Sequence, residues 1–206
     1  MMASEWLATR IADRIGIAVA PCCAIQTLDQ RLVFGSQAVA TLADRVETAR
    51  YLTTPTIDEL GKGESFPGSF FSMVMAFDLF VNNGDRHLAQ FVSTPSATGR
   101  HLYAIDFGRS LFWDWPLIGL PTGESQTIVV GRQLRRLHRF DLNAAQSIIE
   151  GIRSLPGNVV EQMTSDMPQD WLPQRLVDEF LSFWRRGGRD RRCTQVAAEL
   201  NNAANF

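Results

Sequence analysis

The sequence predicts a single domain of the α+β class, in which short β-hairpins are inserted between helices. Its length of 206 residues suits one domain. Hydrophobic residues make up 45% of the chain and charged residues 20%, so it can bury a substantial core. The hydrophobic patterns follow the order helix, hairpin, helices, hairpin, helices. Because strands and helices do not alternate one by one, this order favours an α+β arrangement over a parallel sheet.

The first elements are expected to be an amphipathic helix and a hairpin. Apolar residues recur at helical spacing between Ser4 and Ile15, and Gly16 suits the end of that helix. Two extended stretches follow, at residues 19–28 and 31–39, and the Asp-Gln dipeptide between them predicts a hairpin turn. This part of the chain therefore predicts a helix packed beside a two-stranded unit.

The middle of the chain is expected to hold a buried helix and a second hairpin. Residues 40–66 suit a short helix followed by a polar loop. The helix predicted over 67–81 is apolar on nearly every side, which is typical of a buried helix. Asn82-Asn83-Gly84 ends it, because Asn and Gly tolerate the left-handed conformation. Short strands at 91–92 and 102–105 form the second hairpin.

The remainder of the chain is expected to be mostly helical. A helix is predicted over 141–155, with Pro156-Gly157 stopping it. Further helices are predicted over 172–186 and 191–200. These helices would complete a bundle around the buried helix.

Composition limits the classes of function. The formal net charge is −2 and the pI is about 5.9, which argues against a generally basic surface that coats nucleic acid. A local basic patch is still compatible with these values, and nucleic acid is not expected as a partner. Nearly all of the cations are arginines, and Lys62 is the only lysine. Any mechanism that needs a lysine therefore has one candidate.

Cysteine usage and the N-terminus bear on localisation. Cys22 and Cys23 are adjacent and Cys193 is distant, so no disulfide framework is expected, and no Cys or His spacing indicates zinc. The N-terminus lacks a continuous apolar stretch, so no secretory signal is predicted. No run approaches the ~18 apolar residues that span a bilayer. We expect a soluble cytoplasmic protein without a membrane partner.

Two short segments carry the candidate chemistry. Asn83-Gly84-Asp85-Arg86-His87 follows the buried helix, and Ile105-Asp106-Phe107-Gly108 ends the second hairpin. The hairpin would bring Asp85 and Asp106 to one rim. Phosphoryl transfer requires such a pair, because one carboxylate accepts the proton of the attacking hydroxyl and another holds the Mg²⁺ that neutralises the phosphates. Each segment alone also suits an ordinary turn, but their order and spacing make the pair specific.

Residues 77–87 resemble the catalytic segment of HipA-like kinases, which are bacterial relatives of the protein kinase fold. The opening stretch, 4–21, and the Pro-x-x-Trp segment at 167–172 are also similar to parts of that family. The resemblance implies a protein-kinase-like fold that consists mostly of the helical large lobe. It implies a remnant small lobe and hinge at residues 1–60 and a catalytic lobe at 61–206.

The resemblance also implies the roles of individual residues, with ATP and Mg²⁺ as cofactors. Asp85 would be the catalytic base, and Asp106 would be the Mg²⁺ ligand. Asp106 and Gly108 would both belong to the turn that binds the nucleotide. His87 would be a structural or phosphate-side partner, or else a hydrogen-bonded histidine that packs the loop. Glu5 matches the helix glutamate that pairs with a nucleotide-binding lysine in kinases. Its alternative role, a first-turn acid that interacts with the helix dipole, is favoured here because no lysine is available.

Buried Asp78 would be costly without a partner, so we expect it to hydrogen-bond the backbone of the catalytic loop. The family's second metal ligand, an Asn, is replaced by Gln90. The extra methylene moves the amide oxygen by about 1.5 Å. Because Mg²⁺ demands near-ideal bonds of about 2.0–2.1 Å, Gln90 can be a metal ligand only if the loop adjusts.

A second departure concerns the start of the chain. In the family the Gly-rich loop and the strand lysine lie upstream of the segment that Met1 begins here. Gly61-Lys62-Gly63-Glu64 lacks the spacing of a phosphate-binding loop and suits an ordinary surface loop. We expect either a longer reading frame, a small lobe from a separate chain, or a non-catalytic relative. Exposed apolar surface near residues 19–39 would then favour self-association or a partner.

Three hypotheses follow. The first is an ATP- and Mg²⁺-dependent kinase that phosphorylates a Ser/Thr hydroxyl, with a protein as substrate. The second is a catalytically impaired pseudokinase or truncated kinase that acts as a protein-interaction module. The third is nucleic-acid binding through the arginines between Arg185 and Arg192, for which a solvated helix end is the favoured alternative.

Overall fold

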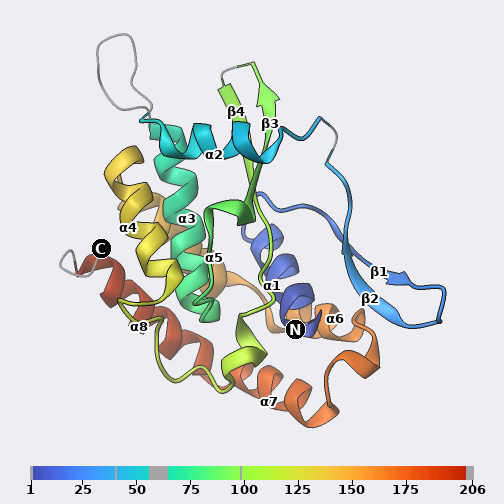
Figure 1. The fold of residues 1–206 in the computed structure, drawn as a ribbon. Helices are drawn as coiled ribbons and strands as arrows, with labels where there is room; N and C mark the ends of the chain where they lie inside the picture. The colour runs from blue at the N-terminus through green and yellow to red at the C-terminus, as the bar shows by residue number, and fades with distance from the viewer. Residues whose placement is uncertain (1, 40, 56–64, 98, 203–206) are drawn as a thin grey trace.

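The computed structural model describes residues 2–39, 41–55, 65–97 and 99–202, and burial of the side chains at 65 and 66 is not described. It confirms the α+β class, with helices around two separate β-hairpins (Figure 1). Three short 3₁₀ turns, η1, η2 and η3, lie at Leu88–Gln90, Leu111–Asp114 and Gln169–Trp171. The other elements are α1 (Met2–Arg14), β1 (Cys22–Gln26), β2 (Leu32–Ser36), α2 (Arg45–Thr53), α3 (Ser65–Val81), β3 (Phe91–Ser96), β4 (Gly99–Ala104), α4 (Gln126–His138), α5 (Leu142–Ser154), α6 (Gly157–Ser165), α7 (Gln174–Arg185) and α8 (Gly188–Asn201).

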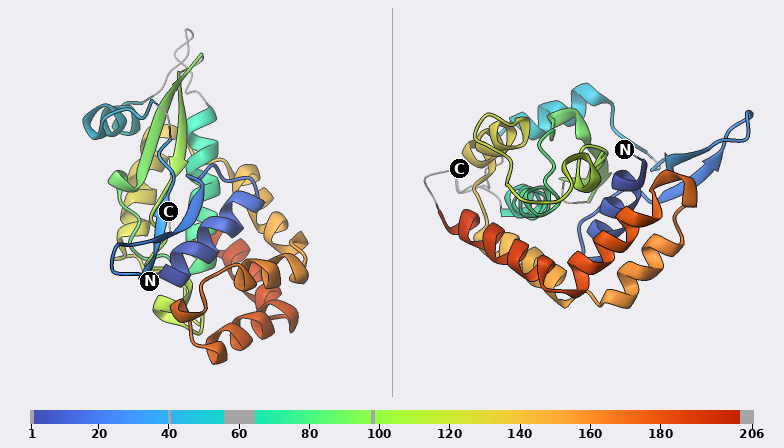
Figure 2. Two further views of the ribbon diagram at one scale, coloured as in Figure 1. Left: turned by 90° about the vertical axis from the view of Figure 1, so that its right-hand side faces the viewer. Right: turned by 90° about the horizontal axis from the view of Figure 1, so that it is seen from below.

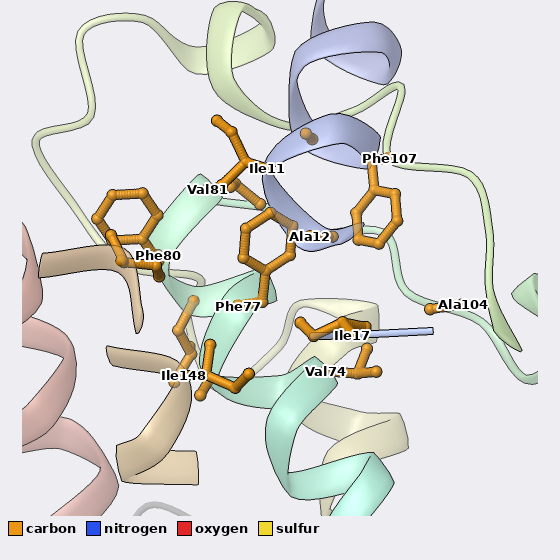
Figure 3. Packing of buried hydrophobic residues seen from close by; sticks show 14 of the residues in the cluster. Ile11, Ala12, Ile17, Val74, Phe77, Phe80, Val81, Ala104, Phe107 and Ile148 are labelled. Atoms are coloured by element: carbon orange, nitrogen blue, oxygen red, sulfur yellow. The ribbon is translucent and has the colours of Figure 1, made fainter. Parts of the chain in front are cut away.

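Helix α3 is the centre of the fold, with α4, α5 and α8 packed around it (Figure 1). Its apolar residues face several neighbours at once, as the sequence predicts, and Phe77 and Phe80 are fully buried. Figure 3 shows Phe77 beside Phe107, with Ile11 of α1 nearby. The rings of Phe77 and Phe107 meet edge to face, with centroids 5.5 Å apart. Burial of each such ring stabilises the fold by about 1.5–3 kcal/mol.

The two hairpins differ in their surroundings. In β1–β2, Cys22 pairs with Ser36 and Gln26 with Leu32, and the hairpin extends away from the helices (Figure 2). In β3–β4, Phe91 pairs with Ala104, and both of these residues are buried in the core. The second hairpin is therefore fixed to the body of the protein at the end that leads to the candidate site.

The segment after α1 differs from the prediction. Instead of joining a long first strand, Val19 forms an isolated parallel bridge with Ala104 of β4. The backbone N–H of Ala104 donates to the carbonyl of Ala18 at 3.0 Å. Since β4 runs directly into Asp106, this bridge attaches the end of α1 to the strand that delivers the second candidate carboxylate.

Helices α4 and α6 were not predicted individually. The side chain of Ser125 caps α4 by accepting a hydrogen bond from the N–H of Ile128. Pro156-Gly157, interpreted as a stop after α5, also begins α6. A proline is tolerated at the start of a helix because the first N–H groups have no partner within that helix. The Gly61-to-Glu64 segment lies outside the described residues.

Two of the arginines near α8, Arg185 and Arg192, make contacts within the fold. Arg192 is buried and donates from Nε to the carbonyl of Phe80 at 3.0 Å and from Nη2 to that of Leu79 at 2.7 Å. It thereby satisfies carbonyl groups at the C-terminal end of α3, which have no partner within the helix. Arg185 pairs with Glu161.

Within the described residues, no helix has both the length and the apolar character that crossing a membrane requires.

His138 links α4 to α2 and makes stability depend on pH. Its ring is 3% exposed, and its Nε2 lies 2.6 Å from the carbonyl oxygen of Leu52. In the described part of the chain Nδ1 has no hydrogen-bond partner. Burial lowers the pKa of His138 below its ordinary 6.5. The folded state therefore keeps this ring neutral at pH values where the unfolded chain takes up a proton.

We expect the free energy of unfolding to fall as pH drops below about 6.5, by at most about 1.4 kcal/mol per pH unit for this one group. Urea unfolding at pH 8, 6.5 and 5 would measure it. His138→Gln keeps a donor for Leu52 but does not titrate, so its pH dependence should be less steep. Identical pH dependence in the two proteins would contradict the assignment.

Candidate active site

The candidate catalytic loop begins where α3 ends. Asn82 has a φ of +57°, in the left-handed region that ends helices. The N–H of Asn83 then donates to the carbonyl of Asp78 at 2.8 Å, which closes the last turn. The chain turns back along the core, and Asp85 and His87 stand in the loop between α3 and η1.

A buried ion pair holds this loop to α3. Nε of Arg86 lies 2.8 Å from Oδ2 of Asp78, and Nη2 lies 2.8 Å from Oδ1. The side chain of Asn83 also donates to Oδ1 of Asp78, at 2.9 Å. Asp78 and Arg86 are 0% and 2% exposed. Asp78 thus supports the loop as expected, but through the side chains of two loop residues rather than through the loop backbone.

Arg86 also reaches the second candidate segment. It donates from Nη1 to the carbonyl of Ile105, the residue before Asp106. Its guanidinium lies 4.6 Å from the ring centroid of Phe107 and 5.6 Å from that of Phe91. One side chain therefore fixes the first loop relative to the segment that follows β4, and the two flanking rings exclude water from the pair.

The start of α4 braces the loop from the other side. The hydroxyl of Thr127 accepts a hydrogen bond from the N–H of Arg86 at 3.0 Å and donates to the carbonyl of Asn83. The N–H of Thr127 donates to the carbonyl of Gly84 at 3.4 Å. The backbone on both sides of Asp85 is thus held by one threonine.

Asp85 itself contacts two basic side chains. Its Oδ1 lies 3.0 Å from Nε2 of His87 and 3.4 Å from Nη1 of Arg109. The guanidinium of Arg109 lies over the ring of Trp113, 5.3 Å from the centroid. His87 and Arg109 are both about half exposed, so this carboxylate stands at the surface end of the loop. The two contacts on one oxygen fix the orientation of the carboxylate.

Gln90 bridges the loop to Asp106. Its Oε1 accepts from the N–H of His87 at 3.0 Å, and its Nε2 donates to Oδ2 of Asp106 at 2.9 Å. Because a backbone N–H can only donate, the amide oxygen must face His87 and the nitrogen must face Asp106. In this arrangement Gln90 does not offer an oxygen on the Asp106 side, which differs from its expected role as a metal ligand.

Asp106 and Glu5 meet at the turn that follows β4. Asp106 has a φ of +61°, an uncommon conformation that is often found at functional sites. Burial raises the pKa of Glu5 to about 7, and hydrogen bonds from the backbone N–H groups of Phe107 and Asp106 oppose the shift. A Cβ at Gly108 would lie 3.2 Å from Oε2 of Glu5 and 3.6 Å from Oδ1 of Asp106. Glycine therefore leaves room between the two carboxylates.

The residues singled out from the sequence thus form a connected group. Hydrogen bonds lead from Asp85 through His87 and Gln90 to Asp106, and Glu5 lies against the turn that holds Asp106. No cluster of three or more His, Cys, Asp or Glu side chains suited to a metal occurs in the described ranges. Mg²⁺ needs only one or two protein carboxylates beside phosphate and water oxygens, so the Asp106 carboxylate fits it.

Sequence reasoning missed three contributors: Arg86, Thr127 and Arg109. Arg86 could have been found, because a carboxylate buried in an apolar helix needs a cation, and Arg86 lies eight residues after Asp78. Thr127 and Arg109 carry no such local signal, since their contacts depend on how α4 and the post-β4 turn pack.

Comparisons with known proteins bear on the family and the fold. The profile of a family described as HipA-like kinase matches residues 1–180. The fold is similar to the Helicobacter pylori proinflammatory kinase CtkA, with 12% identity, a TM-score of 0.58, and coverage of 98% of this chain and 84% of that one. It is also similar to a chain from the Shewanella oneidensis MR-1 structure of HipA, HipB and operator DNA. That match has 10% identity and a TM-score of 0.53, and it covers 100% of this chain and 56% of that one. No curated protein matches the sequence.

The buried ion pair should be essential for stability. Arg86→Met would leave Asp78 charged, buried and without its cation, so we expect a loss of about 3–5 kcal/mol in the free energy of unfolding. The double variant Asp78→Leu/Arg86→Met removes both charges and should recover part of that loss. Urea unfolding of the three proteins would measure both effects. A loss below about 1 kcal/mol in the single variant would contradict this role.

Proposed function

Because the chain belongs to the HipA-like kinase family, we propose that it transfers a phosphoryl group from ATP to the hydroxyl of a serine or threonine in a protein. Asp85 acts as the catalytic base, and Asp106 is the carboxylate that holds Mg²⁺. The observation that carries this proposal is the hydrogen-bonded path from Asp85 through His87 and Gln90 to Asp106.

That path supports the two roles because its short, directional hydrogen bonds hold the carboxylates of Asp85 and Asp106 in fixed positions relative to each other. Oδ1 of Asp85 is occupied by His87 and Arg109, so its Oδ2 is the oxygen that accepts the proton of the acceptor hydroxyl. His87 and Arg109 orient the base. Phosphoryl transfer requires little covalent chemistry from a protein, and most of the acceleration comes from such positioning and from charge stabilisation.

The nucleotide end of the site is organised around Asp106. Gln90 occupies Oδ2 of Asp106, which leaves Oδ1 on the side of Gly108 for a cation. Mg²⁺ bound there would neutralise the phosphate charge of ATP. Glu5 lies against the same turn, where its carboxylate supports Asp106 and Gly108. We assign Glu5 this role in place of a pair with lysine.

Phosphate transfer from radiolabelled ATP, with Mg²⁺ present, tests the proposal. We expect incorporation into the chain itself or into added protein substrates, and a loss of at least about 100-fold in Asp85→Asn and Asp106→Asn. Both substitutions keep side-chain size and remove one charge, so folding can be checked by circular dichroism. Full activity in either variant would reject its assigned role.

A pseudokinase that acts as a protein-interaction module is the second candidate. The amide nitrogen of Gln90 faces Asp106, so the arrangement offers the metal one protein oxygen where kinases offer two. Titration calorimetry with ATP, with and without Mg²⁺, separates the candidates. Magnesium-dependent binding at micromolar concentration supports the kinase, and absence of binding supports the module.

A further inference from the structure

Helix α4 carries an arginine face, made of Arg132 and Arg136 in the helix and Arg139 at its C-terminal end. Their spacing of four and three residues places them on one side of a helix. The helix contains no Asp or Glu, so nothing within it neutralises these charges. Like charges three and four residues apart repel each other, which makes the face unfavourable for the isolated helix.

The described residues outside α4 do not supply the missing charge. Several arginines elsewhere pair with carboxylates, as Arg100 does with Glu47 and Arg185 with Glu161. Arg132, Arg136 and Arg139 form no ion pair with any carboxylate in the described ranges. Arg132 donates only a long hydrogen bond, 3.4 Å, to a backbone carbonyl. The face therefore presents cationic charge to the solvent.

The surface at this face is hollowed. An open groove of about 480 Å³ lies between α4 and the end of α2, lined by both cationic and apolar groups. Its lining residues are Thr53, Val129, Arg132, Gln133, Arg136 and Leu137. A groove with cationic side chains and apolar groups between them suits an extended acidic polypeptide. Its lining offers no aromatic ring on which a nucleic-acid base could stack, which disfavours single-stranded nucleic acid.

The face lies on the helix that braces the candidate site. Thr127, which holds the backbone beside Asp85, begins the same helix. Arg132 and Arg136 lie five and nine residues beyond it, which is about 7.5 Å and about 13.5 Å along the helix axis. An extended polypeptide advances ~3.3 Å per residue, so these distances correspond to roughly two to four residues from an acceptor hydroxyl at Asp85.

We propose that the arginine face binds an acidic stretch of the polypeptide substrate, whose Asp or Glu residues lie roughly two to four positions from the phosphorylated serine or threonine. This inference rests on the proposed kinase function. Charge complementarity selects acidic segments, and the groove holds them so that the acceptor hydroxyl reaches Asp85. The face thus determines which hydroxyls are presented to the catalytic base.

Binding can be measured without catalysis. The probe is a fluorescent peptide with one serine and glutamates about two to four positions away on both sides, and its control carries glutamines instead. Anisotropy in the absence of ATP should show at least about tenfold tighter binding of the glutamate peptide, and rising salt should weaken it. Arg132→Glu/Arg136→Glu should remove this preference. Arg191→Glu, which reverses an exposed charge near the start of α8, should keep it.

Several outcomes would overturn the inference. They are equal binding of the two peptides, equal losses in the α4 and Arg191 variants, or tighter binding of a single-stranded oligonucleotide of the same charge through the same arginines. The kinase proposal fails separately. Acid-selective binding without phosphate transfer contradicts only the kinase, whereas phosphate transfer without acid selectivity contradicts only the arginine face.

Discussion

The site depends on one interaction, the buried ion pair between Asp78 and Arg86. Two charges removed from water are stable only when nearly all of their hydrogen-bonding capacity is used. Here Asp78 also binds Asn83, and Arg86 also binds the carbonyl of Ile105. The requirement for complete pairing therefore fixes α3, the loop with Asp85 and the end of β4 in one arrangement. A merely apolar contact would tolerate sliding, because it has no direction.

Gln90 shows how one methylene changes a site. With its longer side chain, the amide reaches both the N–H of His87 and the carboxylate of Asp106. The bridge joins the two candidate carboxylates through protein groups and leaves the amide nitrogen on the metal side. The same residue thus supports a preorganised pair of carboxylates and reduces the number of oxygens for a cation. This conflict is the physical basis of the two functional candidates.

Helix α4 joins the candidate catalytic loop to the arginine face. At its start Thr127 holds the backbone on both sides of Asp85, and toward its end the arginine face borders an open groove. A helix is rigid over this distance, since its backbone hydrogen bonds are internal. A polypeptide bound along α4 would therefore be held in register with the catalytic loop. Around α8, by contrast, Arg185 and Arg192 are engaged within the fold.

The sequence alone determined the α+β class, the buried α3 and the two segments that carry Asp85 and Asp106, because periodicity, helix ends and short motifs are local properties. It also indicated that Asp78 needs a partner. The tertiary structure decided which partner that is, and it placed Glu5 against the Asp106 turn, where burial rather than the helix dipole dominates its pKa. It decided the hydrogen bonds of Gln90 and the position of α4 as well. These depend on contacts between residues far apart in the chain, which local patterns do not encode.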